Sequence, residues 1–193
     1  TKHLIRKKYK KIILIEKDSN LLKYLQQYKN KKISILNRDA LNFNLHDLNI
    51  SKNSIIVGNL PFNISSQLLI KWISVKKWPP FYSKMYLMFQ SEVGKRIIAN
   101  KDSNDYGKIS VLVQSRCDVK KIAHAPSNIF HPKPKVNGLV IEFIPSKKYQ
   151  DVDFEILQKI TKSAFEKRRK KIKNSLDLFS EYFEDWDEKK DLR

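Results

Sequence analysis

The stretch that decides the fold is residues 54–61, SIIVGNLP, an apolar run rich in β-branched residues that ends at a proline. Such a run predicts a strand buried on both faces, which stops where proline removes a backbone donor. Similar runs occupy 11–18 (KIILIEKD), 32–36 (KISIL) and 84–90 (KMYLMFQ). Apolar residues at helical spacing follow three of these runs, over 20–30, 65–72 and 91–100. We expect Ser19 to cap the first helix. This alternation predicts a parallel sheet with helices on both faces.

The second half of the sequence adds two longer β-like runs, at 108–125 and 138–144, joined by the Pro-rich connection 130–136. Two neighbouring runs of this kind predict an antiparallel hairpin at the edge of the sheet. The predicted fold is therefore α/β, with a mostly parallel, Rossmann-like sheet of seven strands. From Asp153 the pattern becomes helical. We expect a Rossmann-like domain over 1–150 and a small helical domain over 151–193.

Composition limits the classes of protein that fit. The chain has 193 residues, 41% hydrophobic and 31% charged, which argues against a disordered or a membrane protein. Cys117 is the single cysteine, so disulfides and cysteine-rich zinc sites are excluded. The four histidines lack ligand spacing, and we expect no metal. The start of the sequence lacks a secretory apolar segment, and we expect a cytoplasmic protein with no membrane partner.

The formal net charge is +19, which indicates a polyanionic partner. A lysine-biased proteome is the alternative, since 32 of the 39 basic residues are lysine. The charge is nevertheless segregated: 159–173 holds eight cations and one acid, whereas 174–193 holds three cations and seven acids. Uniform bias would not produce this division, and we favour a nucleic-acid surface.

Ligands of parallel α/β sheets bind at the carboxyl ends of the strands, which directs attention to Glu16, Asp39 and Asn59. Glu16 suits the hydroxyls of an adenosine ribose, but a solvated strand-end carboxylate is as good an interpretation. Asp39 could receive an adenine amino group or simply shape a turn. Residues 59–62, NLPF, are more informative: the Asn59 amide oxygen and the Leu60 carbonyl offer two acceptors for one exocyclic amine. Phe62 can stack on the ring that bears the amine.

Several motifs together resemble a known family. IEKD, DAL, GNLPFNIS, YGKISVLVQ, FHPKPKV and AFEKRRKKIKNSL occur in the order found in small-subunit ribosomal RNA adenine dimethyltransferases. The resemblance runs from about Ile12 to Leu176. It implies an enzyme that uses S-adenosylmethionine to dimethylate the N6 amino groups of two adjacent adenosines near the 3′ end of small-subunit ribosomal RNA. It also implies a role in ribosome biogenesis, with the immature small subunit as partner. We expect a monomer.

The resemblance assigns roles residue by residue. It places five residues with the cofactor: Glu16, Lys17, Asp39, Ala40 and Asn59. It places five at the target base, where Asn59 and Leu60 orient the amine and the two aromatic rings hold the base: Asn59, Leu60, Pro61, Phe62 and Phe130. It implies an RNA path along nine further residues: Lys95, Arg96, Lys133, Lys135, Arg168, Arg169, Lys171, Lys173 and Asn174.

Two features depart from the family pattern. The family has a strand and a Gly-rich cofactor loop ahead of the ribose acid, but the first glycine in this sequence is Gly58. We therefore expect this sequence to be part of a longer protein, incomplete at both ends. Phe62 also replaces the tyrosine common in bacterial members.

Two alternative functions remain open. One is a large-subunit ribosomal RNA adenine methyltransferase that confers antibiotic resistance. The other is an RNA-binding assembly factor whose methylation is secondary or lost.

Overall fold

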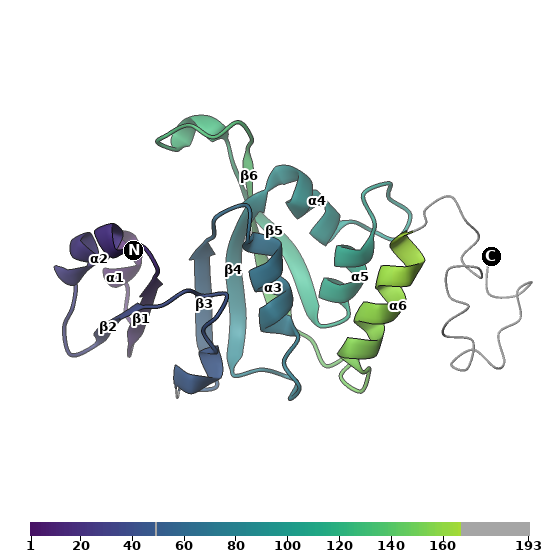
Figure 1. The fold of residues 1–193 in the computed structure, drawn as a ribbon, viewed down its shortest axis with the longest axis horizontal. Coiled ribbons are helices and arrows are strands. Elements are labelled where there is room, and N and C mark those ends of the chain that lie inside the picture. Colours follow the sequence, from purple (N-terminus) through teal and green to yellow (C-terminus); the bar gives the residue numbers. More distant parts are fainter. Residues whose placement is uncertain (49, 167–193) are drawn as a thin grey trace, which may run out of the picture. The chain divides into compact units, whose positions relative to one another are not determined.

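The computed structural model describes residues 1–48 and 50–166, and the chain divides into two compact units, Thr1–Ile50 and Ser51–Arg193. Figure 1 labels the helices and strands of both units. We describe each unit by itself. The division at residue 50 was not among the sequence predictions, and the boundary expected near residue 150 stays a prediction.

The first unit is a two-stranded parallel sheet with short helices. Its elements are α1 (Lys2–Ile5), β1 (Ile12–Glu16), α2 (Ser19–Gln26), β2 (Ile33–Asn37) and the 3-10 turn η1 (Leu45–Leu48). The register aligns Glu16 with Asn37, so the two strands end at the same edge. The cap of α2 is Asp18 instead of Ser19, since the Asp18 carboxylate accepts the Asn20 backbone N–H at 2.7 Å. The expectation for Ser19 was wrong by one residue.

The second unit is a four-stranded sheet in the order β3-β4-β6-β5. Its elements are β3 (Ser54–Asn59), α3 (Ser65–Ile73), β4 (Tyr82–Gln90), α4 (Ser91–Ile98), α5 (Lys108–Gln114), β5 (Cys117–Ala125), the 3-10 turn η2 (Ser127–Ile129), β6 (Gly138–Pro145) and α6 (Phe154–Glu166). Strands β3 and β4 are parallel, whereas β6 is antiparallel to both β4 and β5. The parallel strands and the antiparallel hairpin confirm the predicted α/β architecture. The described residues nevertheless form six strands in two sheets, where the sequence predicted seven strands in one.

The prediction of a β run over 108–125 is wrong for its first seven residues, which form α5. Four hydrogen bonds of two polar side chains explain this helix. Ser110 Oγ accepts the Gly107 backbone N–H at 3.0 Å and donates to the Arg96 carbonyl at 2.6 Å. The Gln114 side chain donates to the carbonyls of Ile97 and Ala99. Polar side chains of α5 thus donate hydrogen bonds to backbone carbonyls at the end of α4. These tertiary contacts outweigh the preference of the β-branched residues of α5 for a strand.

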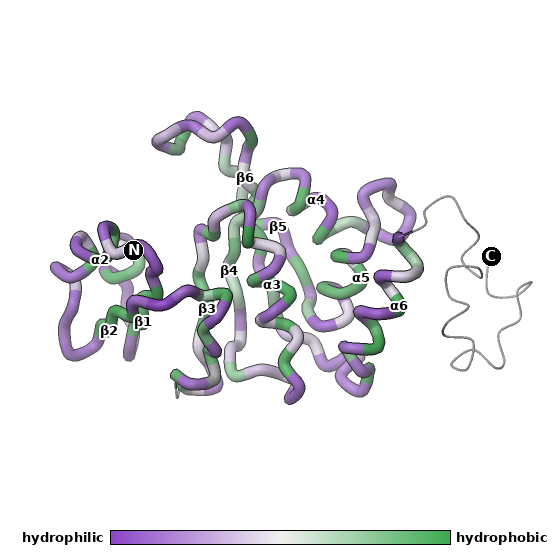
Figure 2. The backbone as a smooth tube through the Cα atoms, viewed as in Figure 1, coloured by the Kyte–Doolittle hydropathy of each residue, from purple (hydrophilic) through white to green (hydrophobic). Residues whose placement is uncertain are grey.

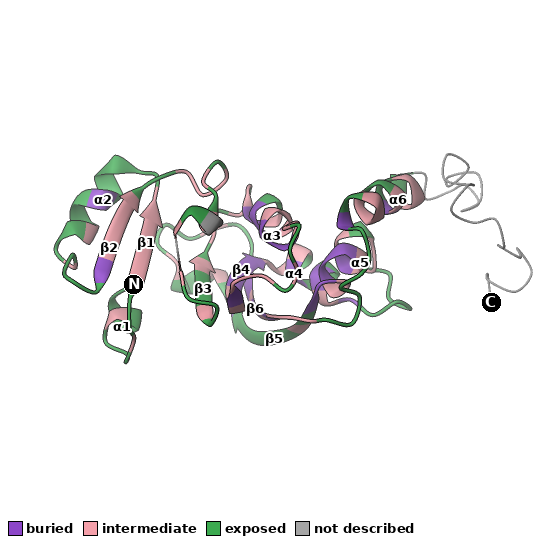
Figure 3. Ribbon diagram, turned by 90° about the horizontal axis from the view of Figure 1, so that it is seen from below, coloured by how far each residue is buried: buried purple, intermediate pink, exposed green. Residues whose placement is uncertain are grey.

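The core of the second unit lies between the sheet and helices α3, α4 and α5. Figure 2 shows hydrophobic residues along the strands and on α3 and α5, and Figure 3 shows buried residues on the same elements. Met85, Leu87 and Phe89 of β4 are fully buried, and the Phe89 ring meets the Phe143 ring edge-on with centroids 5.9 Å apart. These contacts hold the parallel strands from which the candidate site extends.

Helix α6 is held to the second unit by the buried Arg116. Its guanidinium lies between the rings of Trp78 and Phe154, at 4.9 and 5.0 Å from their centroids. The helical pattern predicted from Asp153 is confirmed as far as Glu166. None of the helices in residues 1–48 and 50–166 is long and apolar enough to cross a membrane.

Candidate active site

Glu16 is oriented by the backbone that follows it. Its Oε1 accepts the N–H groups of Lys17 at 2.8 Å and Asp18 at 2.9 Å, just ahead of α2. Its second oxygen, Oε2, has no hydrogen-bond partner among the described residues. The carboxylate is therefore fixed through one oxygen, and the other remains an acceptor for a ligand.

Asp39 lies beside Glu16, two residues beyond the end of β2. Its Oδ2 pairs with Lys17 Nζ at 2.7 Å, and its Oδ1 accepts the Leu41 backbone N–H at 2.9 Å. The Lys17 side chain is 74% exposed, whereas the Asp39 side chain is 21% exposed. Ala40 is half-buried in the turn that follows. The first unit thus brings Glu16 and Asp39, with their neighbours Lys17 and Ala40, to the end of the paired strands β1 and β2, and their role at a cofactor stays a prediction.

Asn59 is the last residue of β3, in the second unit. It is exposed, and its side-chain amide has no hydrogen-bond partner among the described residues. The carbonyl of the next residue, Leu60, likewise accepts no hydrogen bond from the described chain. Two consecutive residues at the carboxyl end of a parallel strand therefore each offer a hydrogen-bond acceptor that has no partner among the described residues.

The backbone around Asn59 and Leu60 is tightly constrained. A Cβ at Gly58 would lie 2.7 Å from Leu60 Cδ2 and 3.1 Å from Leu87 Cδ2, so only glycine fits there. Beyond Pro61, the Phe62 carbonyl accepts the hydroxyl of Ser65, which is fully buried at the start of α3. The NLPF segment is thus connected to β3 on one side and to α3 on the other.

Phe130 lies in the loop 126–137, which connects β5 to β6. Gly138, the first residue of β6, aligns with Gln90, the last residue of β4, so the loop begins at the end where the parallel strands finish. Figure 1 shows this loop projecting beyond that end of the sheet. The structure therefore places Phe62 and Phe130 at the same end of the second unit. Their contact with a base stays a prediction.

The predicted RNA-binding cations fall into three places. Lys95 and Arg96 are exposed on α4, where Arg96 pairs with Glu92 at 2.6 Å. Lys133 and Lys135 are exposed in the loop 126–137. The remaining predicted residues lie outside the described residues: Arg168, Arg169, Lys171, Lys173 and Asn174.

Other titratable groups do not form a competing site. Burial raises the pKa of the Cys117 thiol to about 12, so this cysteine is neutral and unsuited to nucleophilic attack. Within 1–48 and 50–166, no three His, Cys, Asp or Glu side chains are grouped as metal ligands would be. Hydrogen bonds from Tyr86 at 2.6 Å and Lys84 at 3.1 Å lower the pKa of Glu142, but this cluster lies within the sheet, away from the strand ends.

Sequence reasoning missed polar residues close to this end of the second unit. Gln90 ends β4 as Asn59 ends β3, and Asn137 follows the FHPKPKV segment. The same strand-end rule that selected Asn59 would have selected Gln90. The contacts of Asn137 depend on the loop geometry and carry no signal in the sequence.

A comparison with known families decides the identity. A family profile described as ribosomal RNA adenine dimethylase matches residues 1–192. The chain belongs to this family. Within it, the chain is similar to ribosomal RNA small subunit methyltransferase A of Bradyrhizobium diazoefficiens, with 35% identity over 91% of this chain and 63% of that protein. The protein of the same name from Blochmanniella pennsylvanica is 37% identical over 87% of this chain and 63% of its own length. The chain therefore spans less than two thirds of these family members.

Solved structures support the fold of this dimethylase family member. A dimethyladenosine transferase from Plasmodium falciparum superposes with a TM-score of 0.74 at 25% identity, covering 92% of this chain and 65% of that one. The 23S rRNA methyltransferase ErmE superposes with a TM-score of 0.62 at 18% identity, over 87% of this chain and 66% of that one. At that identity the second likeness shows the Rossmann-like fold alone.

Proposed function

We propose that the protein transfers methyl groups from S-adenosylmethionine to the N6 amino groups of two adjacent adenosines in small-subunit ribosomal RNA. The observation that carries the proposal is the pair of unpaired acceptors, Asn59 and the Leu60 carbonyl, at the carboxyl end of β3. Membership of the adenine dimethylase family and the similarity to ribosomal RNA small subunit methyltransferases A support the same reaction.

The chemistry explains why two acceptors are useful. An adenine amine is a poor nucleophile because its lone pair is delocalised into the ring. If Asn59 Oδ1 and the Leu60 carbonyl accept its two hydrogens, the nitrogen is favoured in a pyramidal form with its lone pair free. The proton can leave after the methyl group is transferred, so no base with a tuned pKa is required. Catalysis is then mainly positioning, which can contribute about 7–11 kcal/mol.

Aromatic rings would hold the target base in that position. Phe62 is half-buried, and its backbone carbonyl accepts the Ser65 hydroxyl, so its backbone is fixed where its ring would stack on the base. Phe130 lies at the same end of the sheet and would close on the base from the loop 126–137. An adenine in a duplex must leave its stack to be reached, whereas an unpaired adenine is captured at lower cost.

The first unit fits the cofactor. Glu16 Oε2 is an unpaired carboxylate oxygen on a fixed side chain, which suits a ribose hydroxyl. Asp39 would accept a hydrogen bond from the adenine amino group, and Ala40 would flank it. When bound, S-adenosylmethionine supplies the electrophilic methyl group. Lys17, which follows Glu16 in the chain, would be a further residue of this cofactor site.

The excess of cations supports an RNA substrate. We infer that Lys95, Arg96, Lys133 and Lys135 contact phosphates, together with the basic segment 167–174. The partner would be the immature small ribosomal subunit, bound by one copy of the protein in the cytoplasm.

The test is methyl transfer to separated RNAs. The full-length protein is incubated with S-adenosylmethionine carrying a labelled methyl group and with undermethylated small-subunit or large-subunit RNA. We expect label only in small-subunit RNA. Label in large-subunit RNA would support the antibiotic-resistance alternative, and tight binding without label would support the assembly-factor alternative.

A further inference from the structure

A cavity of about 460 Å³ lies at the junction of the end of β4, the start of α4 and the loop 126–137. Its polar lining comes from Gln90, Ser91, Glu92, Ser127, Lys135 and Asn137. Its volume is within the range of about 300–1,000 Å³ typical of ligand sites. None of these residues except Lys135 has a role in the proposed reaction.

Asn137 makes the frame of this cavity rigid. Its Oδ1 accepts the Ser127 backbone N–H at 2.8 Å, which ties the two ends of the loop together. Its backbone carbonyl accepts the Ser91 N–H at 2.9 Å, which ties the loop to the start of α4. Helix α4 is itself held close to β6, because a Cβ at Gly94 would lie 2.7 Å from Leu139 Cδ2. The cavity therefore has walls fixed by backbone contacts.

Two side chains of the cavity have unused hydrogen-bonding capacity. Ser91 Oγ is buried and has no partner among the described residues. The Gln90 amide makes no capping bond to α4 and no other side-chain bond within the described chain. A buried hydroxyl without a partner is unfavourable, so a ligand that supplies a partner gains from it. A glutamine amide can form two hydrogen bonds to the edge of an adenine.

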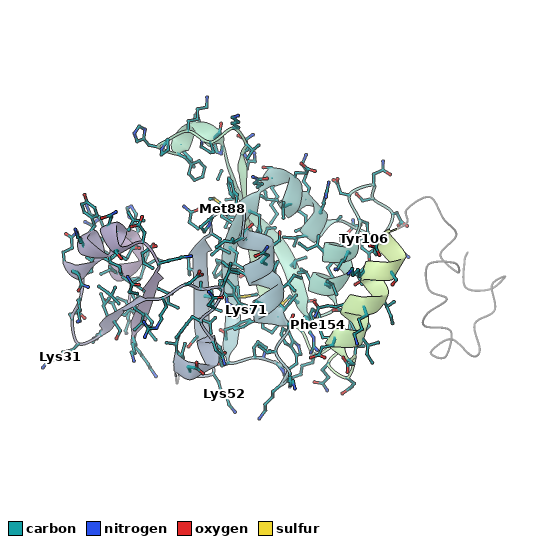
Figure 4. The ribbon with its side chains drawn as sticks, viewed as in Figure 1. Lys31, Lys52, Lys71, Met88, Tyr106 and Phe154 are labelled. Carbon is teal, nitrogen blue, oxygen red and sulfur yellow. The ribbon has the colours of Figure 1, made fainter. Side chains whose placement is uncertain are left out.

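The cavity lies close to the candidate catalytic residues. Asn59 aligns with Met88 across β3 and β4, and Gln90 is two residues further along. At about 3.3 Å per residue, Gln90 extends about 7 Å beyond the level of Asn59 on the neighbouring strand. Figure 4 labels Met88 at this end of β4. A base held at Asn59 would thus have its neighbour in the RNA chain near Gln90.

The charge at the cavity suits a nucleotide. Lys135 is exposed and forms no ion pair with the described residues. The carboxylate at the rim, Glu92, is paired with Arg96 at 2.6 Å and so does not repel a phosphate as a free acid would. The loop 126–137 carries two lysines and no acidic residue.

From these observations we propose that the cavity binds the nucleotide next to the methylated adenosine. Gln90 reads the edge of its base, Ser91 Oγ pairs with a polar group of the same nucleotide, and Lys135 contacts its phosphate. Gln90 is then a specificity-determining residue, which selects the sequence around the target without touching the reacting amine. The inference rests on the proposed function for the identity of the target.

The experiment measures preference for the flanking base. Small-subunit RNAs are prepared in which each nucleotide beside the target adenosine is changed in turn, and both Kd and kcat/KM are measured with the full-length protein. We expect the affinity of the wild type for RNA to fall by roughly 5- to 150-fold when one flanking base is changed, which is the effect of one lost bidentate contact. Gln90→Ala should bind the natural and changed RNAs equally. Gln150→Ala, at an exposed glutamine far along the chain, should keep the wild-type preference.

A second variant tests the phosphate contact. Lys135→Ala should keep the flanking-base preference and lower the salt slope of RNA binding by about 0.7–0.9. Lys147→Ala, at another exposed lysine, should leave the slope unchanged.

An unchanged flanking-base preference in Gln90→Ala would overturn the inference, whether activity falls uniformly or stays normal. A flanking-base preference that is seen in Kd and lost in Gln90→Ala would support the inference. It would do so even if no RNA is methylated, because the missing methylation would refute only the proposed function.

Discussion

Replacing Asn59 separates the proposed mechanism from any role of Asn59 in the fold. Asn59 is exposed and its amide has no partner among the described residues, so Asn59→Ala should change the free energy of unfolding by less than about 0.5 kcal/mol. Losing one preorganised polar partner of the amine should raise the barrier to methyl transfer by at least about 2–3 kcal/mol. The rate should therefore fall by roughly 30- to 150-fold.

Single-turnover methyl transfer, with protein in excess over RNA, measures this rate without product release. RNA affinity, measured in parallel, should be nearly normal because Asn59 carries no charge. The matched control is Asn53→Ala, at an exposed asparagine just before the opposite end of β3, which should react at the wild-type rate. An Asn59→Ala protein with near-normal single-turnover rate would refute the positioning mechanism. A large loss of stability would show that Asn59 acts through the fold.

Three further predictions concern the same unit. Phe62→Ala should weaken binding of the target base by about 1–3 kcal/mol, whereas Phe62→Tyr should keep this binding energy because the ring is preserved. Equal losses of kcat/KM in the two variants would mean that the ring packs in the protein and does not stack on the base. Gly58→Ala should destabilise the protein by about 1–3 kcal/mol and slow turnover, because the new Cβ displaces Leu60. Gly107→Ala, where a Cβ meets nothing within 4 Å, should change neither stability nor turnover. Thermal unfolding and methyl-transfer rates measure both effects. Because the pKa of Glu142 is lowered, its carboxylate stabilises the fold above the ordinary pKa of 4.5, and this stabilisation is lost as pH falls through the pKa of the folded state. Glu142→Gln should therefore make the free energy of unfolding less dependent on pH in acid. An unchanged dependence would contradict a stabilising role of the Glu142 carboxylate.

The strands were predictable where local pattern and burial agree. The runs at 11–18, 32–36, 54–61 and 84–90 all contain a parallel strand, because apolar, β-branched residues favour strands. The burial of 54–61 on both faces was wrong, since Ile55 and Val57 of β3 are exposed. The segment 108–114 was misassigned because Ile and Val favour strands locally, whereas the bonds of Ser110 and Gln114 to the end of α4 come from tertiary structure. No local pattern reports such contacts.

The candidate site was predictable to a similar extent. The strand-end rule selects Glu16 and Asp39, which lie at the end of the paired strands β1 and β2, and Asn59, which ends β3 in the second unit. It does not reveal that Lys17 pairs with Asp39, since the two residues are 22 positions apart and a lysine after a strand is unremarkable in a chain this basic. The unpaired Ser91 hydroxyl likewise depends on packing around the start of α4.

The most direct test of the account is the chemical identity of the product. Undermethylated small-subunit RNA is treated with the full-length protein and S-adenosylmethionine, digested to nucleosides and analysed by mass spectrometry. Two acceptors that orient an exocyclic amine predict methylation at adenine N6, and the proposed reaction predicts N6,N6-dimethyladenosine at two adjacent positions. Its absence from the Asn59→Ala reaction is predicted as well. A methyl group on a ribose hydroxyl, on a ring nitrogen or on another base would contradict the account.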